Sequence, residues 1–94
     1  MNIEKKIWPE NFERILNGEK NVEFRLANFE IKDGDSLILR EYDKQNLHYT
    51  GRRIIREVLG VKKVDFSNLN FDGAYTQEQL NEFGVYKIEL ERMI

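Results

Sequence analysis

Three ionisable side chains lie within six residues of one another in the first third of the sequence. Lys20, Glu23 and Arg25 follow a glycine in the stretch Gly18-Glu19-Lys20-Asn21-Val22-Glu23-Phe24-Arg25. Lysine and arginine bind phosphate, and arginine does so through a planar fork of donors. A glutamate accepts a hydrogen bond from the exocyclic amine of a base such as cytosine. These residue types favour contact with a nucleotide-like ligand, and the alternative is an ion pair of Glu23 with Lys20 or Arg25.

Lys20 also has the chemistry of a nucleophile or general base, provided that burial or a neighbouring cation lowers its pKa. The alternatives are a solvated lysine after a helix end and a simple phosphate contact. Other catalytic classes are disfavoured, because the chain has no cysteine and one histidine, His48. A thiolate site, a serine–histidine pair and an imidazole metal site are therefore not expected. We expect no metal and no cofactor.

Two further side chains are candidate ligand contacts. Trp8, directly before Pro9, could stack on a base, although such a residue is more often part of a core. Arg40 could bind phosphate or pair with an acidic neighbour. Those acidic neighbours are Asp33, Asp35 and Glu41. The tyrosines have the same two interpretations as Trp8, and they are Tyr42, Tyr49, Tyr75 and Tyr86.

The overall charge limits how nucleic acid could be bound. The chain has 94 residues, so residues 1–94 form one domain, with 15 basic and 17 acidic side chains and a net charge of -2. A chain of this charge does not coat nucleic acid by bulk attraction, so any such site is a local patch. One basic run could track a phosphate backbone or form a solvated face. It consists of Arg52, Arg53, Arg56, Lys62 and Lys63.

The sequence also bears on the compartment. No apolar run approaches the roughly 20 residues that span a bilayer. The first six residues are mostly polar, which does not fit a signal peptide. The absence of cysteine suits a reducing compartment. We expect a cytoplasmic domain with no membrane contact.

The elements that must position Lys20, Glu23 and Arg25 follow from the pattern of apolar residues. A strand over residues 3–8 precedes a short helix over residues 10–17, whose stripe is Phe12, Ile15 and Leu16 and which ends at Gly18. In the strand Asn21 to Leu26, Val22, Phe24 and Leu26 alternate with polar residues. We expect the apolar face of this strand to contribute to the core.

The remaining elements complete a small sheet. A turn at Asp33-Gly34-Asp35 leads into a strand over Ser36 to Tyr42, and a polar loop spans Asp43 to Gly51. The next strand, Arg52 to Lys63, breaks alternation and predicts a bulge near Gly60. Further elements are a turn-rich segment with Leu69 and Phe71 pointing inward, a helix opened by a capping box at Thr76–Gln79, and a strand over Val85 to Glu91. About five strands and two short helices predict a mostly β (α+β) fold, a small barrel without exposed edges.

An ordered set of motifs resembles the ASCH-type domains of the PUA-like superfamily. It begins with Ile7-Trp8-Pro9-Glu10-x-Phe12 and Ile15-Leu16-x-Gly18-x-Lys20-x-x-Glu23-Phe24-Arg25. It continues with Gly34-Asp35, Leu39-Arg40-Glu41-Tyr42-Asp43, Tyr49-Thr50-Gly51-Arg52 and Gly84-Val85-Tyr86-Lys87-Ile88. The set is most similar to one small bacterial and phage subfamily, a domain of unknown function. The resemblance covers almost the whole chain and is weakest from Val64 to Tyr75.

The resemblance implies a PUA-like β-barrel with a cleft beside the helix and the Gly-x-Lys strand, and RNA binding by analogy of fold. One ASCH group hydrolyses N4-acetylcytidine with a lysine, a threonine and a glutamate. Lys20 matches that lysine, Glu23 stands at the threonine position, and no residue matches the glutamate by motif.

Three hypotheses follow. The first is a PUA-like module that binds RNA or a nucleotide-like ligand through Lys20, Glu23 and Arg25, with Trp8 and Arg40 as neighbours. The second is a small amidohydrolase that acts on an N4-acylated cytidine-type nucleoside through Lys20 and Glu23. The third is a protein-interaction module of a phage or bacterium, for which the sequence identifies no partner.

Overall fold

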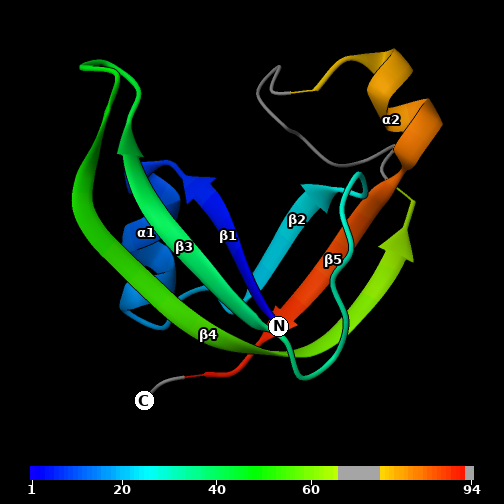
Figure 1. Cartoon of the computed structure of the whole chain (residues 1–94), viewed down its shortest axis with the longest axis horizontal. Helices are drawn as coiled ribbons and strands as arrows, with labels where there is room; N and C mark the ends of the chain where they lie inside the picture. Colours follow the sequence, from blue (N-terminus) through cyan, green and yellow to red (C-terminus); the bar gives the residue numbers. More distant parts are fainter. Residues whose placement is uncertain (66–74, 93–94) are drawn as a thin grey trace.

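The chain folds into a five-stranded mixed sheet with two helices, so the predicted α+β class is confirmed (Figure 1). The computed structural model describes residues 1–65 and 75–92. The elements are β1 (Asn2–Ile7), α1 (Pro9–Leu16), β2 (Val22–Leu26), β3 (Ser36–Asp43), β4 (His48–Val64), α2 (Gln77–Phe83) and β5 (Val85–Leu90). The predicted inward positions of Leu69 and Phe71 lie outside the described residues. Neither α1 nor α2 is long and apolar enough to cross a membrane.

The sheet has the order β1-β3-β4-β5-β2, and it is not closed. β1 is parallel to β3, and the other three pairs are antiparallel. The edge strands β1 and β2 lie on opposite sides of a strongly bent sheet and face each other across its inside (Figure 1). The prediction of a barrel without edges is therefore wrong. Charged residues on both edges, Lys5 and Arg25, give the physical reason, because inward-pointing charges are one way in which edge strands avoid pairing.

The sheet bends because β4 is shared between its two halves. The first part of this 17-residue strand pairs with β3 and the last part with β5. The register shifts between Val58 and Gly60, which confirms the predicted bulge near Gly60. A second irregularity, between Arg40 and Tyr42 of β3, is not predicted by the sequence pattern. Opposite it, Gly51 has a φ of 94°, a conformation that favours glycine.

The hairpin that joins β3 and β4 is longer than predicted. Strand pairing continues to Asp43 and His48, inside the segment expected to be a loop. The turn is short because the Asp43 carboxylate accepts hydrogen bonds from the backbone N–H groups of Gln45 (2.9 Å) and Asn46 (3.1 Å). This local turn chemistry lets polar residues form paired strands where composition alone predicts a loop.

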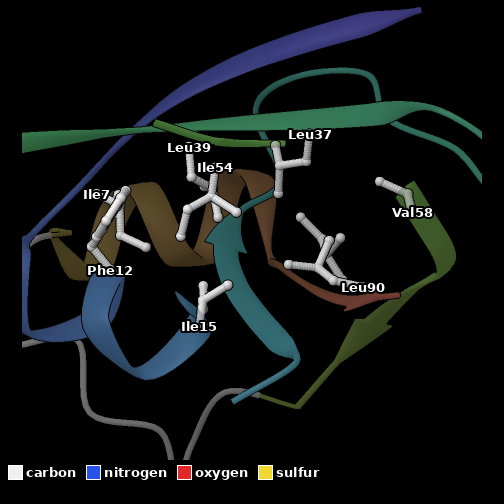
Figure 2. Packing of buried hydrophobic residues seen from close by; sticks show 9 residues of the cluster. Ile7, Phe12, Ile15, Leu37, Leu39, Ile54, Val58 and Leu90 are labelled. Carbon is white, nitrogen blue, oxygen red and sulfur yellow. The ribbon is translucent and has the colours of Figure 1, made fainter. Parts of the chain in front are cut away.

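One apolar cluster joins β1, α1, β3, β4 and β5 (Figure 2). Its nine members are Ile7, Phe12, Ile15, Leu37, Leu39, Ile54, Val58, Ile88 and Leu90. The helix contributes Phe12 and Ile15 as predicted, whereas Leu16, the third member of the predicted stripe, is 47% exposed. The helix therefore lies on the sheet through one narrow stripe, and its next turn leads directly to Lys20.

β2 turns its polar residues, not its apolar ones, toward this cluster. Glu23 is in register with the core residue Ile88, so the two side chains share a face of the sheet. Leu26 is in register with Val85 on the opposite face, and both are buried there. The apolar face of β2 contributes the buried Leu26, as expected, but on the face opposite the main cluster, and α2, opened by the predicted capping box, packs against β2.

Candidate functional site

Glu23 is a buried carboxylate held between two cations. Its Oε1 atom lies 3.1 Å from Nζ of Lys20, and its Oε2 atom accepts a 3.0 Å hydrogen bond from Nε of Arg25. Only 5% of the Glu23 side chain is exposed, against 21% for Lys20 and 17% for Arg25. The structure thus brings together the three residues that the sequence singled out, and Glu23 pairs with both cations, where the sequence offered a pair with Lys20 or Arg25 as the alternative to ligand contact.

The turn after α1 determines where Lys20 lies. The backbone N–H of Gly18 donates to the carbonyl of Ile15, and that of Lys20 donates to the carbonyl of Arg14 at 3.0 Å. Gly18 has a φ of 83°, which a glycine adopts at low cost and which ends the helix as predicted. Because both ends of this turn are hydrogen-bonded, Lys20 is presented at the entrance to β2.

Lys5 of β1 lies near Lys20, Glu23 and Arg25 through its proximity to Arg25, and it was not predicted from the sequence. Its Nζ atom lies 3.7 Å from the centre of the Phe29 ring, which meets Tyr86 edge-on at 5.8 Å. Burial of the ammonium lowers the pKa of Lys5, and the nearby charge of Arg25 lowers it further. The signal in the sequence was its position between Ile3 and Ile7, which places a lysine on the inward face of a strand.

We call Lys5, Lys20, Glu23 and Arg25 the edge cluster, since they lie where the two unpaired strand edges face each other. Three cations and one carboxylate give it a formal charge of +2, within a chain of net charge -2. Such a cluster attracts an anionic group, and its arginine and lysines supply N–H donors to bind it.

Trp8 and Arg40 do not lie beside Glu23. Arg40 alternates along β3 with the buried Leu39 and Glu41, so it projects from the opposite, outer face of the sheet. Its Nη1 atom donates to Oε1 of Glu4 at 3.0 Å, and not to Asp33, Asp35 or Glu41 as considered from the sequence. Trp8 is half-buried, and its ring lies 6.0 Å from that of Tyr42 on the same outer face.

A second buried glutamate, Glu41, has a different environment. Its Oε1 accepts hydrogen bonds from Oγ1 of Thr50 at 2.6 Å and from Nε of Arg52 at 2.9 Å, and its Oε2 accepts from Nη2 of Arg52 at 2.8 Å. Arg52 also pairs with Glu13 of α1 and stacks over Phe12, with its guanidinium carbon 4.5 Å from the ring centre. We call Glu13, Glu41, Thr50 and Arg52 the hairpin cluster.

In the hairpin cluster each charged side chain is paired with another member of the cluster. The hydrogen bonds from Arg52 hold the pKa of Glu41 below its usual value, against the opposing effect of burial. The two carboxylates in turn raise the pKa of Arg52. The sequence analysis placed Arg52 in a basic run and missed this network, although Glu41 continues the inward positions of Leu37 and Leu39.

Other predicted residues have structural roles. Asp35 accepts a 3.0 Å hydrogen bond from the backbone of Lys32, which lowers the pKa of Asp35, so the turn chemistry expected of it is confirmed. The basic run does not form one surface, since Arg52 turns toward α1 while Arg53 lies opposite Arg40 on the outer face. Within residues 1–65 and 75–92, no group of His, Asp or Glu side chains could hold a metal ion.

Comparison with known proteins assigns the family. The model of a domain of unknown function, DUF3850, matches residues 4–79. The chain belongs to the DUF3850 family. All four members of the edge cluster and all four of the hairpin cluster lie in the segment that defines this DUF3850 domain.

The DUF3850 domain also has a structural neighbour. A crystal structure of the hypothetical protein PH0355 is similar with a TM-score of 0.72 over 99% of this chain and 100% of that chain, at 23% identity. This likeness shows a shared fold. No curated protein matches the DUF3850 chain by sequence.

Proposed function

We propose that this DUF3850 domain binds RNA or a nucleotide-like ligand at the edge cluster. One observation supports the proposal above the others: two cations bind a single buried carboxylate, and a third cation, Lys5, lies near Arg25, at two strand edges of a chain that is acidic overall. Lys20, Arg25 and Lys5 would contact phosphate oxygens. Glu23 would orient the two cations that it binds. It would also accept a hydrogen bond from the amine of a base that displaces one of these cations.

Energetics support a binding role over a purely structural one. Removing two charges from water costs several kcal/mol, and the attraction between them often does no more than offset this cost. The Lys20–Glu23–Arg25 arrangement is therefore weak as a stabilising device. It is well suited to ligand binding, since the half-buried cations are held in place before the ligand arrives.

We further propose an ASCH-type, PUA-like affiliation. Its support is the ordered set of motifs from Ile7 to Ile88, together with a bent five-stranded sheet whose first helix leads directly into the Gly-x-Lys turn. RNA binding by analogy with that superfamily agrees with the charge of the edge cluster. A bound nucleotide located beside Lys20 in a crystal structure would test both parts of this proposal.

The binding test is a titration of the labelled chain with cytidine 5′-monophosphate and with a single-stranded RNA octamer, followed by amide chemical shifts. We expect shifts at residues 5 and 20–25, and an affinity whose logarithm falls with the logarithm of salt with a slope of about -2 for three phosphate contacts. The double variant Lys20→Met/Arg25→Met should weaken binding at least tenfold. The matched control is Lys62→Met/Lys63→Met, which removes the same charge from exposed positions of β4. Equal losses of affinity in both double variants would show that the effect arises from bulk charge alone.

The amidohydrolase alternative has one favourable contact. The Lys20 amine lies 3.1 Å from a Glu23 carboxylate oxygen, which places a potential nucleophile beside a potential base. The same contact is an ion pair, so a substrate would have to separate the Lys20 amine from Glu23 before the amine could attack. Release of acetate from N4-acetylcytidine by the wild type, and its loss in Lys20→Ala, would establish this activity.

The protein-interaction alternative would be favoured if neither nucleosides nor the RNA octamer shifted any amide.

A further inference from the structure

A second surface with the chemistry of nucleic-acid recognition lies on the other side of the sheet. Three aromatic rings form a row across the outer face, with centroid distances of 6.0 Å between Trp8 and Tyr42 and 5.1 Å between Tyr42 and Tyr49. Trp8 lies between β1 and α1, Tyr42 on β3 and Tyr49 on β4, and Tyr49 is 42% exposed. The row is separate from the edge cluster, since Tyr42 follows the inward-pointing Glu41 on the opposite face of β3.

Each ring carries a cation from a neighbouring side chain. Nζ of Lys6 lies 4.0 Å from the Tyr42 centroid, and the guanidinium carbon of Arg40 lies 4.0 Å from that of Tyr49. Nζ of Lys44 lies 5.3 Å from the Trp8 centroid. The acidic groups nearby are engaged: Glu4 binds Arg40, and Asp43 accepts three hydrogen bonds from its own turn. The surface therefore presents aromatic faces and three cations, beside the carboxylates of Glu4, Glu10 and Asp43.

We infer that this outer face binds single-stranded nucleic acid, with bases stacked on Trp8, Tyr42 and Tyr49 and phosphates on Lys6, Arg40 and Lys44. Interleaved rings and cations are the combination that binds single strands without reading sequence. The energies of base stacking and of the cation–π contacts show whether a base could displace the cations. A cation–π contact at an exposed site is worth about 0.5–1 kcal/mol, whereas stacking of one base on an aromatic ring is worth about 1–3 kcal/mol. A base can therefore displace the cation, whose long side chain then swings to the adjacent phosphate.

The shape of the surface favours an extended strand over an enclosed small molecule. The hollow beside Trp8 is lined by Pro9, Glu10, Asp43, Lys44 and Gln45 and has a volume of about 260 Å³. That volume is below the roughly 300–1,000 Å³ of ordinary small-molecule pockets. The three rings are inclined to one another, by 54° between Trp8 and Tyr42 and by 81° between Tyr42 and Tyr49, so successive bases of one strand would meet them at different angles.

Trp8 provides the probe for this inference, since it is the single tryptophan of the chain. We would titrate the full chain with a uridine octamer and follow Trp8 fluorescence. An abasic octamer keeps the phosphates but has no bases to stack. We expect quenching by the uridine octamer and little change with the abasic one. Unchanged emission with both, or equal quenching by both, would overturn the stacking inference.

Variants separate this surface from the edge cluster. Tyr49→Ala should weaken octamer binding at least fivefold, and Lys6→Met/Lys44→Met should reduce the salt slope, whereas Leu59→Ala at another exposed position of β4 should leave binding unchanged. Lys20→Met/Arg25→Met should retain the quenching of Trp8. Loss of quenching in that double variant, with Tyr49→Ala unaffected, would contradict a separate outer site. Retention of quenching without any shift at residues 20–25 would instead contradict the edge-cluster proposal alone.

Discussion

The edge cluster and the hairpin cluster use the same components in opposite ways. Each has a glutamate that is 4% exposed and that binds cationic side chains. In the hairpin cluster two carboxylates surround one guanidinium, for a formal charge of -1, and the network joins α1 to the β3–β4 hairpin. In the edge cluster two cations bind one carboxylate and a third, Lys5, lies near Arg25, for a formal charge of +2, between strands that do not pair.

The difference shows how a buried carboxylate can be assigned a role. Glu41 accepts three hydrogen bonds, and its main partner Arg52 is held by a second carboxylate and an aromatic ring. Because the charged members of this network pair with one another, the network contributes to folding. Glu23 leaves its cations half-buried with unbalanced charge, which is the basis of our proposal that the group binds an anion. Burial alone does not separate the two cases, but the balance of charge around each carboxylate does.

The largest expected effect is on stability at the hairpin cluster. Glu41→Ala should lower the free energy of unfolding by about 3 kcal/mol, because it removes a buried carboxylate that accepts three hydrogen bonds, two of them from a guanidinium. For a domain of this size, this corresponds to a fall in Tm of roughly 10–20 °C. Glu23→Ala should cost about 1 kcal/mol, since Glu23 accepts one hydrogen bond, from Arg25, beside its ion pair with Lys20. Urea denaturation of both variants measures the contrast, and a larger loss for Glu23→Ala would reverse the assignment of roles.

The next effect is on ligand binding at the edge cluster. Lys20→Met/Arg25→Met should weaken binding of the RNA octamer at the edge cluster at least tenfold, because two of the three cations are removed, while the unfolding midpoint changes little. Thr50→Val, at the hairpin cluster, should lower stability and leave affinity unchanged. Affinity at two salt concentrations and denaturation of each variant provide the measurement. A binding defect in Thr50→Val as large as that of the double variant would remove the distinction between the clusters.

A smaller effect is expected in acid. The pKa of Glu41 is lowered in the folded state, so its ion pair contributes stability that is present above the usual glutamate pKa and is lost as pH falls through the folded pKa. The stability difference between the wild type and Glu41→Ala should therefore shrink progressively below about pH 4.5. Urea midpoints at pH 7, 5 and 3.5 give this comparison. A difference that stays constant to pH 3.5 would show that the charge of Glu41 contributes little.

The smallest expected effect is a change in the titration of Lys5. Burial and then the Arg25 charge lower its pKa in the free domain. An anion bound at the edge cluster favours the ammonium form, so it should raise this pKa toward the usual lysine value. Carbon-13 shifts of the Lys5 side chain, followed against pH with and without cytidine 5′-monophosphate, measure the change. Lys62 provides the exposed control, and an equal shift at both lysines would show a non-specific effect.

Much of the fold could be predicted from the sequence, because local signals specify it. Gly18 ends the first helix, and the Thr76–Gln79 capping box begins the second through local hydrogen bonds. The disrupted alternation near Gly60 indicates a bulge. The open sheet and the inverted orientation of β2 could not be predicted. Alternation shows that a strand has two faces, but which of them meets the main core depends on where α2 packs.

The candidate site was predictable in part for the same reason. Lys20, Glu23 and Arg25 are close in sequence, and strand geometry keeps them close in space. Lys5 and the ion pairs of Arg52 were not predicted, because the partners are distant along the chain. Lys5 lies near Arg25 and Phe29, and Arg52 pairs with Glu13 and Glu41. Trp8 and Arg40 were expected near the cluster, but alternation along β3 directs Arg40 to the other face, where Trp8 also lies beside Tyr42.

The most direct test of the central claim compares the two clusters in one titration. The labelled chain would be titrated with cytidine 5′-monophosphate, and amide shifts would be followed at residues 5 and 20–25 and at residues 13, 41, 50 and 52. We predict saturable shifts at the edge cluster, their loss in Lys20→Met/Arg25→Met, and no response at the hairpin cluster. Shifts confined to the hairpin cluster, or a silent edge cluster at saturating nucleotide, would contradict the assignment of binding to Lys20, Glu23 and Arg25.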